Sequence, residues 1–147
     1  IAHFSFSILI LSILFNNIFS SEVITNLKIN ETYQAQNLKI SFESIEQENK
    51  QNFKAIKGKF VVEDQSGLIE VMQPELRIYN QPNIVTSEAD IKTNIFTDKF
   101  MTMNYVQNQD YFNIRYQVKP FMIWIWISTI LLCFSGCLSL IRKKYEN

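Results

Sequence analysis

Two long apolar segments, one near each end of the chain, constrain the fold more than any other feature of the sequence. Residues 1–19 are apolar apart from His3, a few serines and the pair Asn16 and Asn17, and residues 121–141 contain no charged side chain. A helix of 19 residues is about 28 Å long, close to the hydrocarbon thickness of a bilayer. The sequence therefore predicts transmembrane helices over residues 1–19 and 121–141.

A cleavable signal peptide is the alternative interpretation of the first segment. Such a peptide starts with basic residues, has a shorter apolar core and ends in small residues at the cleavage site. No basic residue precedes this apolar run, and Phe19-Ser20-Ser21 matches the cleavage pattern poorly. We therefore expect a retained helix.

Residues at the ends of the second segment predict its orientation. Trp124 and Trp126 lie near its start, and residues 142–147 form a basic tail that opens with Arg-Lys-Lys. Tryptophan rings favour the headgroup region, and basic residues favour the cytoplasmic or matrix side. We therefore expect the tail on the inner side and residues 20–120 on the opposite side, in the periplasm or the intermembrane space.

Residues 20–120 are predicted to form one extramembrane domain of β-strands. Apolar and polar side chains alternate over residues 38–43, 56–63 and 112–118, and such alternation predicts strands with one buried face. Shorter strands are predicted over residues 68–73, 76–79 and 100–106. Six or so short antiparallel strands predict a small sandwich or barrel.

Three segments are predicted to connect these strands. Polar residues 46–52 and residues 64–67 are typical of turns. Ser87 is predicted to cap a short helix that runs through Ile91 and Ile95.

His3, the only histidine, lies inside the first predicted transmembrane helix. An ionisable group inside a membrane is costly and therefore suggests a function. If Asn16 and Asn17 mark the outer interface, His3 lies about 18–20 Å further in. Its imidazole suits an axial ligand of haem iron, or it forms a hydrogen bond to another helix or lies at the opposite interface. These alternatives stay open, and any second haem ligand must come from elsewhere.

The predicted extramembrane domain contains no recognisable catalytic residues. Since the only histidine is in the membrane segment, a Ser-His-Asp or Cys-His arrangement is excluded there. Cys133 and Cys137 lack the spacing of metal or redox motifs and are expected to be small apolar side chains within the second helix. Glu75, Arg77 and Tyr79 share one strand face, which is either a polar cluster or a solvated surface.

Several short motifs follow one another in a distinctive order. Ala2-His3 opens the first apolar segment, residues 74–79 read Pro-Glu-Leu-Arg-Ile-Tyr, and residues 87–91 read Ser-Glu-Ala-Asp-Ile. Lys119-Pro120 then precede Trp124-Ile125-Trp126. From residue 2 to about residue 145, this order resembles the C-terminal portion of the cytochrome c maturation haem lyase family, CcmF.

The resemblance implies a role in haem attachment. Members of this family hold a membrane-embedded b-type haem through a histidine in the helix before the β domain, and His3 matches that position. They accept haem from a haem chaperone and join it to apocytochrome c on the outer face of the membrane. The resemblance thus implies a subunit or fragment of the lyase, with haem b as cofactor and His3 as an axial ligand of its iron.

Other features of the family are missing from the sequence. These are the tryptophan-rich haem-binding loop, its two flanking histidines and a second membrane histidine. We therefore expect a split or partial chain that is not catalytic alone and whose partner is the remaining lyase segment or subunit. The alternative is a structural subunit of a respiratory or assembly complex that keeps the fold without the chemistry.

Composition bears on where the chain works. The sequence has 12 Phe but three Gly and three Pro, and Ile, Asn and Lys are abundant, a pattern typical of an AT-rich genome such as that of an organelle. We expect the mitochondrial inner membrane, with the β domain facing the intermembrane space, or alternatively a bacterial inner membrane with a periplasmic β domain. The 14 basic and 14 acidic residues cancel, which excludes the broad basic surface of a nucleic-acid-binding protein.

Overall fold

The computed structural model describes residues 2–35, 38–64 and 67–146 and divides into two compact units. The helix unit comprises Ile1–Ser21, Thr93–Lys99 and Val118–Asn147. The sandwich unit comprises Glu22–Lys92 and Phe100–Gln117. Each unit is built from segments that are distant in the sequence.

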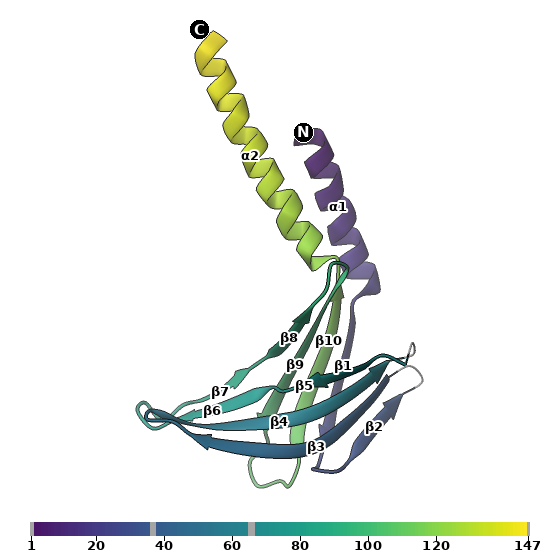
Figure 1. Ribbon diagram of the computed structural model, residues 1–147, viewed down its shortest axis with the longest axis vertical. Helices are drawn as coiled ribbons and strands as arrows, with labels where there is room; N and C mark the ends of the chain where they lie inside the picture. Colours follow the sequence, from purple (N-terminus) through teal and green to yellow (C-terminus); the bar gives the residue numbers. More distant parts are fainter. Residues whose placement is uncertain (1, 36–37, 65–66, 147) are drawn as a thin grey trace. The chain divides into compact units, whose positions relative to one another are not determined.

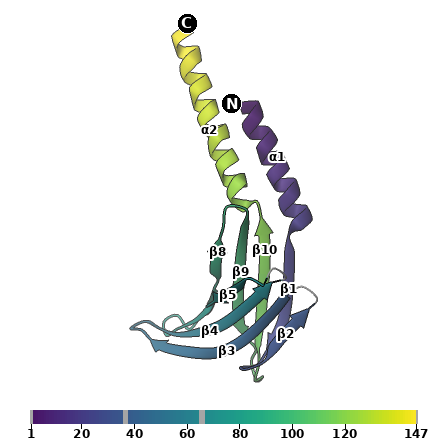
Figure 2. The ribbon, with the colours of Figure 1, turned by 45° about the vertical axis from the view of Figure 1, so that its right-hand side comes forward.

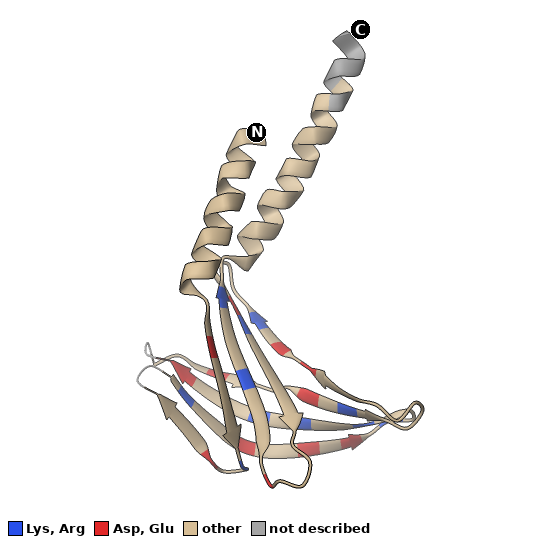
Figure 3. Ribbon diagram, turned by 180° about the vertical axis from the view of Figure 1, so that it is seen from behind, with Lys and Arg blue, Asp and Glu red and all other residues tan. Residues whose placement is uncertain are grey.

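The helix unit contains α1 (Ala2–Phe19) and α2 (Met122–Glu146), which pack against each other (Figure 1). Both helices are long and apolar enough to cross a membrane. The parts of the two helices that are drawn in tan in Figure 3 carry no charged residue. Small buried residues, Ser5 and Ser12 on α1 and Ser128 on α2, let the two backbones approach closely. The predicted pair of apolar helices around a β domain is confirmed.

The strands form two sheets, whose strands cross steeply in both ribbon views (Figures 1 and 2). The first sheet has the order β1 (Ser21–Leu27), β10 (Phe112–Pro120), β9 (Thr97–Tyr105), β8 (Asp90–Thr93). The second has the order β2 (Thr32–Ala35), β3 (Leu38–Asn49), β4 (Phe53–Asp64), β6 (Glu75–Tyr79), β7 (Val85–Glu88), and β5 (Ile69–Met72) also pairs with β4. The predicted mainly antiparallel sandwich is therefore confirmed.

The core lies between the sheets, on the faces that the alternating pattern predicts. Ile40 and Phe42 of β3 are buried beside their register partners Val62 and Phe60 of β4. The rings of Phe42 and Phe60 stack with their centroids 4.3 Å apart. The first sheet contributes further fully or nearly fully buried side chains: Met101, Met103, Ile114 and Tyr116.

The predicted helix beginning at Ser87 is wrong. These residues form β7 and β8, and β7 pairs with β6 in an antiparallel register that places Ser87 opposite Leu76. The Ser87 hydroxyl donates to the carbonyl oxygen of Met103 at 2.8 Å instead of capping a helix. Tertiary pairing has overridden a local capping signal.

One predicted connection differs in extent, and another lies partly outside the described residues. The polar stretch 46–52 is mostly strand, because β3 continues to Asn49 and pairs with β4 across Glu46 and Lys57. Of the predicted turn over residues 64–67, residues 65 and 66 lie outside the described residues. Gly67, the last residue of the predicted turn, has φ +75° and donates its N–H to the Asp64 carbonyl at 3.0 Å.

Gly58 of β4 allows a close approach inside the core. A Cβ at this position would lie 2.6 Å from Cε2 of Phe60 and 2.8 Å from Sδ of Met103. We predict that Gly58→Ala lowers the free energy of unfolding by about 1–3 kcal/mol through overpacking, measured by denaturant titration. Gly136→Ala is the control, because its Cβ would meet nothing within 4 Å; equal effects of both substitutions would contradict the prediction.

Burial of Tyr116 makes the free energy of unfolding depend on pH in the alkaline range. The residue is 3% exposed, and burial, with smaller effects from the charges of Glu70 and Asp64, raises the pKa of Tyr116 to about 12 from its ordinary 10.0. The neutral phenol therefore stabilises the fold fully below pH 10, and this contribution is lost as the pH rises towards 12. We predict a steeper fall in unfolding free energy over this range for the native chain than for Tyr116→Phe; parallel curves would refute it.

Candidate functional site

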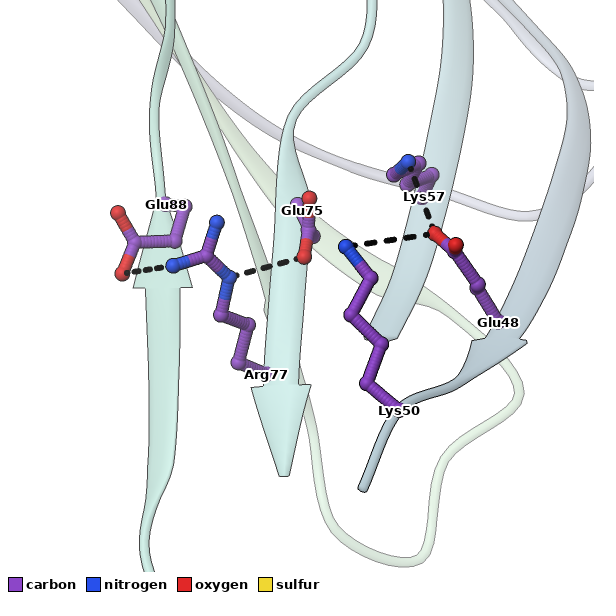
Figure 4. Close-up of polar contacts among 6 residues, drawn as sticks. All are labelled: Glu48, Lys50, Lys57, Glu75, Arg77 and Glu88. Carbon is purple, nitrogen blue, oxygen red and sulfur yellow. Dashed lines mark hydrogen bonds and ion pairs between the residues drawn. The ribbon is translucent and has the colours of Figure 1, made fainter. Parts of the chain in front are cut away.

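The face of the second sheet opposite the core carries the Arg77 cluster, formed by Phe53, Glu75, Arg77, Tyr79 and Glu88. Glu75, Arg77 and Tyr79 alternate along β6 and therefore point to one face. The antiparallel register sets Tyr79 opposite Phe53 and Glu75 opposite Glu88. Side chains from β4, β6 and β7 thus meet on one face, and Figure 4 shows Glu75, Arg77 and Glu88 among them.

Arg77 is held between two carboxylates and an aromatic ring. Its Nε donates to Oε1 of Glu75 at 2.9 Å, and its Nη1 lies 3.5 Å from Oε1 of Glu88. The guanidinium carbon lies 5.2 Å from the centre of the Phe53 ring, within cation–π range. The hydrogen bonds to Glu75 and then to Tyr79 raise the pKa of Arg77 further above its already high value.

Burial in the Arg77 cluster is partial. The Arg77 side chain is 32% exposed, whereas that of Glu75 is 14% exposed. A carboxylate with so little contact with water requires a cation nearby. Since two carboxylates already engage the guanidinium, the arrangement is suited to fixing β6 against β7 rather than to capturing an anionic ligand.

A second group of charges lies next to it on β3 and β4. Oε2 of Glu48 lies 3.2 Å from Nζ of Lys57 and 3.7 Å from Nζ of Lys50 (Figure 4). The hydrogen bond from Lys57, followed by the charge of Lys50, lowers the pKa of the Glu48 carboxyl group. Charges on this face are therefore largely compensated by partners on neighbouring strands.

His3 lies in the first turn of α1 and is exposed. Its backbone carbonyl accepts a hydrogen bond from the Ser7 hydroxyl at 2.9 Å. At 3.6 residues per turn, His3 lies about 180° around the helix from the buried Ser12. The imidazole is therefore on the side of α1 that α2 leaves uncovered.

In the part of the chain that the structure describes, candidate metal ligands are not gathered into a site. Over residues 2–35, 38–64 and 67–146, no group of three or more His, Cys, Asp or Glu residues could hold a metal ion. Cys133 and Cys137 are free and exposed on α2. Because His3 is the only histidine of the sequence, a haem with two histidine ligands would need the second from another segment or subunit.

Two members of the Arg77 cluster, Phe53 and Glu88, were not predicted from the sequence. Glu75, Arg77 and Tyr79 were identifiable from their spacing along one strand, but Phe53 and Glu88 come from other strands. Their position depends on register, and Glu88 was assigned to a predicted helix. The Pro-Glu-Leu-Arg-Ile-Tyr segment therefore supplies one strand of a cluster that is spread over three strands.

We predict that Arg77 stabilises the sandwich measurably. Arg77→Ala should lower the free energy of unfolding, and Arg77→Lys should lower it less, because an ammonium keeps the charge without the planar fork. Arg115→Ala is the matched control, since its ion pair with Glu22 is more exposed. A loss for Arg77→Ala no larger than that for Arg115→Ala would contradict this role.

Comparison with known proteins shows which family this sequence resembles. The family described as the CcmF C-terminal beta-sandwich matches residues 18–120. The cytochrome c-type biogenesis protein ccl1 of Rhodobacter capsulatus is 30% identical over 120 residues, which cover 82% of this chain and 18% of that protein. The cytochrome c-type biogenesis protein CcmF of Pseudomonas fluorescens is 26% identical over 146 residues, covering 99% of this chain and 22% of the relative.

A solved structure shares the fold. The protein described as cytochrome c heme lyase CcmF superimposes with a TM-score of 0.63 at 19% identity, over 90% of this chain and 22% of the other. The chain thus spans about a fifth of the length of these relatives.

Proposed function

Since the chain belongs to the CcmF family through its C-terminal β-sandwich, we propose that it is part of a cytochrome c haem lyase. In this proposal it helps a larger assembly to attach haem covalently to apocytochrome c. The observation that carries the proposal is the family match over residues 18–120, supported by the two apolar helices that flank the sandwich. The assembly would also contain the rest of the lyase and receive haem from a haem chaperone.

In this proposal His3 is an axial ligand of a membrane-embedded b-type haem. The geometry supports it, because the imidazole lies on the side of α1 that α2 leaves uncovered, where another helix can approach. His3 would hold the haem iron through its imidazole, and the second ligand would come from another lyase segment. A partner that orients the second ring nitrogen would also come from there.

The sandwich serves as the extracytoplasmic scaffold in this proposal. Helices α1 and α2 cross the membrane within residues 1–19 and 121–141, residues 20–120 lie on the outer side, and the basic tail 142–147 lies on the inner side. The relatives are bacterial, which supports an inner-membrane location with a periplasmic sandwich. The amino-acid composition, which is typical of an AT-rich genome, supports the mitochondrial inner membrane, with the sandwich in the intermembrane space.

We predict that His3→Ala removes haem from the assembled complex. A reduced-minus-oxidised absorption spectrum of the gently solubilised native complex should show a b-type α-band, and this band should be lost in His3→Ala because iron loses a ligand. Ser7→Ala is the matched control, since it lies one turn along the same side of α1. It should keep the band.

Two outcomes would reject the haem assignment. A b-type band that persists in His3→Ala would exclude His3 as a required ligand. Absence of the band from the native complex would instead favour a structural subunit that keeps the family fold without the chemistry.

A further inference from the structure

The turn between β8 and β9 exposes two large apolar side chains next to each other. Ile95 is 60% exposed and Phe96 is 58% exposed. The turn is closed by the Asn94 N–H, which donates to the Thr97 carbonyl at 2.9 Å. Turns in water usually carry small or polar residues at such positions, so this tip is unusual.

This turn is part of the helix unit and is fastened to the start of α2 (Figure 1). The Phe121 N–H donates to the Phe96 carbonyl at 2.7 Å, and the Trp124 indole N–H donates to the Ile95 carbonyl at 3.0 Å. The rings of Phe96 and Phe121 also meet edge to face, with centroids 6.3 Å apart. The turn is therefore fixed where α2 begins.

The backbone at the tip obtains its hydrogen bonds from protein donors and acceptors. Both tip carbonyls accept bonds from α2 and its approach, as described above, and the Ile95 N–H donates to Oδ1 of Asn94 at 2.6 Å. Hydrocarbon offers no partner to backbone groups, so non-helical backbone at membrane depth must be satisfied internally. This turn meets that condition for three backbone groups: the carbonyls of Ile95 and Phe96 and the N–H of Ile95.

The length of α1 indicates the depth at which Phe96 lies relative to the hydrocarbon of a bilayer. Phe96 lines a groove of about 240 Å³ together with Phe15 of α1 and Trp124 of α2. The 18 residues of α1 span about 27 Å, close to the hydrocarbon thickness. Phe15 precedes the end of α1 by four residues, or about 6 Å. With α1 spanning the bilayer, which rests on the proposed function, a ring in the same groove lies at the edge of the hydrocarbon.

We propose that the β8–β9 turn inserts Ile95 and Phe96 into the lipid bilayer, beside the end of α1 and the start of α2. The partner of this surface is the acyl-chain region below the headgroups, where exposed apolar side chains bind by burying their area. The chain then contacts the membrane through two helices and one wedge. This proposal does not depend on haem binding.

Nitroxide labels on the full chain in phosphatidylcholine–phosphatidylglycerol vesicles test the insertion. Ile95→Cys and Phe96→Cys would be labelled in a Cys133→Ala, Cys137→Ala background, and collisions with oxygen and with a water-soluble nickel chelate would be measured. Phe134→Cys, on an exposed position of α2, is the lipid reference. Gln107→Cys, in the turn at the other end of β9, is the aqueous reference.

Labels at positions 95 and 96 should lose collisions with nickel relative to position 107 and approach the oxygen collisions seen at position 134. Nickel collisions at both positions equal to those at position 107 would overturn the proposal. Shielding of position 96 alone would overturn it as well, because packing in the groove would explain that result. Ile95→Cys changes only an exposed side chain, so it keeps the test decisive if Phe96→Cys fails to fold.

Discussion

The pairing of β1 with β10 is the constraint on which the rest of the structure depends. Strand β1 begins two residues after α1 ends, and β10 ends two residues before α2 begins. Because the two strands are neighbours in one sheet, the chain leaves one helix and returns to the other at adjacent points. The Asn16 side-chain amide, which donates to the Pro120 carbonyl at 2.6 Å, links α1 to the residue where β10 ends.

This arrangement provides what helix packing in lipid alone supplies weakly. Apolar helices gain little from contact with each other in hydrocarbon, so their association depends on close packing and a few polar contacts. Here the hydrogen bond from the Asn16 amide to the Pro120 carbonyl is such a polar contact. One face of α1 packs against α2, and the face that bears His3 is left uncovered by α2.

Much of the fold was predictable from local patterns, and the errors have a common physical cause. Alternation around Ile40, Phe60 and Ile114 predicted buried strand faces, because period two reports directly on burial. Ser87 resembles a helix cap because capping is a local signal, whereas its hydroxyl donates to the carbonyl of Met103 in the other sheet. Register, which local patterns do not contain, decided these cases.

The two candidate sites, His3 and the Arg77 cluster, also differ in how far they were predictable from local sequence. His3 was identifiable from the sequence because an ionisable residue in an apolar segment is conspicuous, whereas the face it occupies needed the helix geometry. The Arg77 cluster was only partly predictable, since Phe53 and Glu88 approach Arg77 across strands. The structure favours a stabilising role for this cluster, because the charges in it are compensated.

The central claim, that this chain works as part of a haem lyase, is tested most directly by purifying it from its native membrane through an affinity tag. Mass spectrometry would identify every polypeptide that copurifies under mild detergent. The account predicts that the tryptophan-rich haem-binding segment is recovered, either in the same polypeptide or in a copurifying subunit. Recovery of an intact, folded chain without that segment would contradict the account.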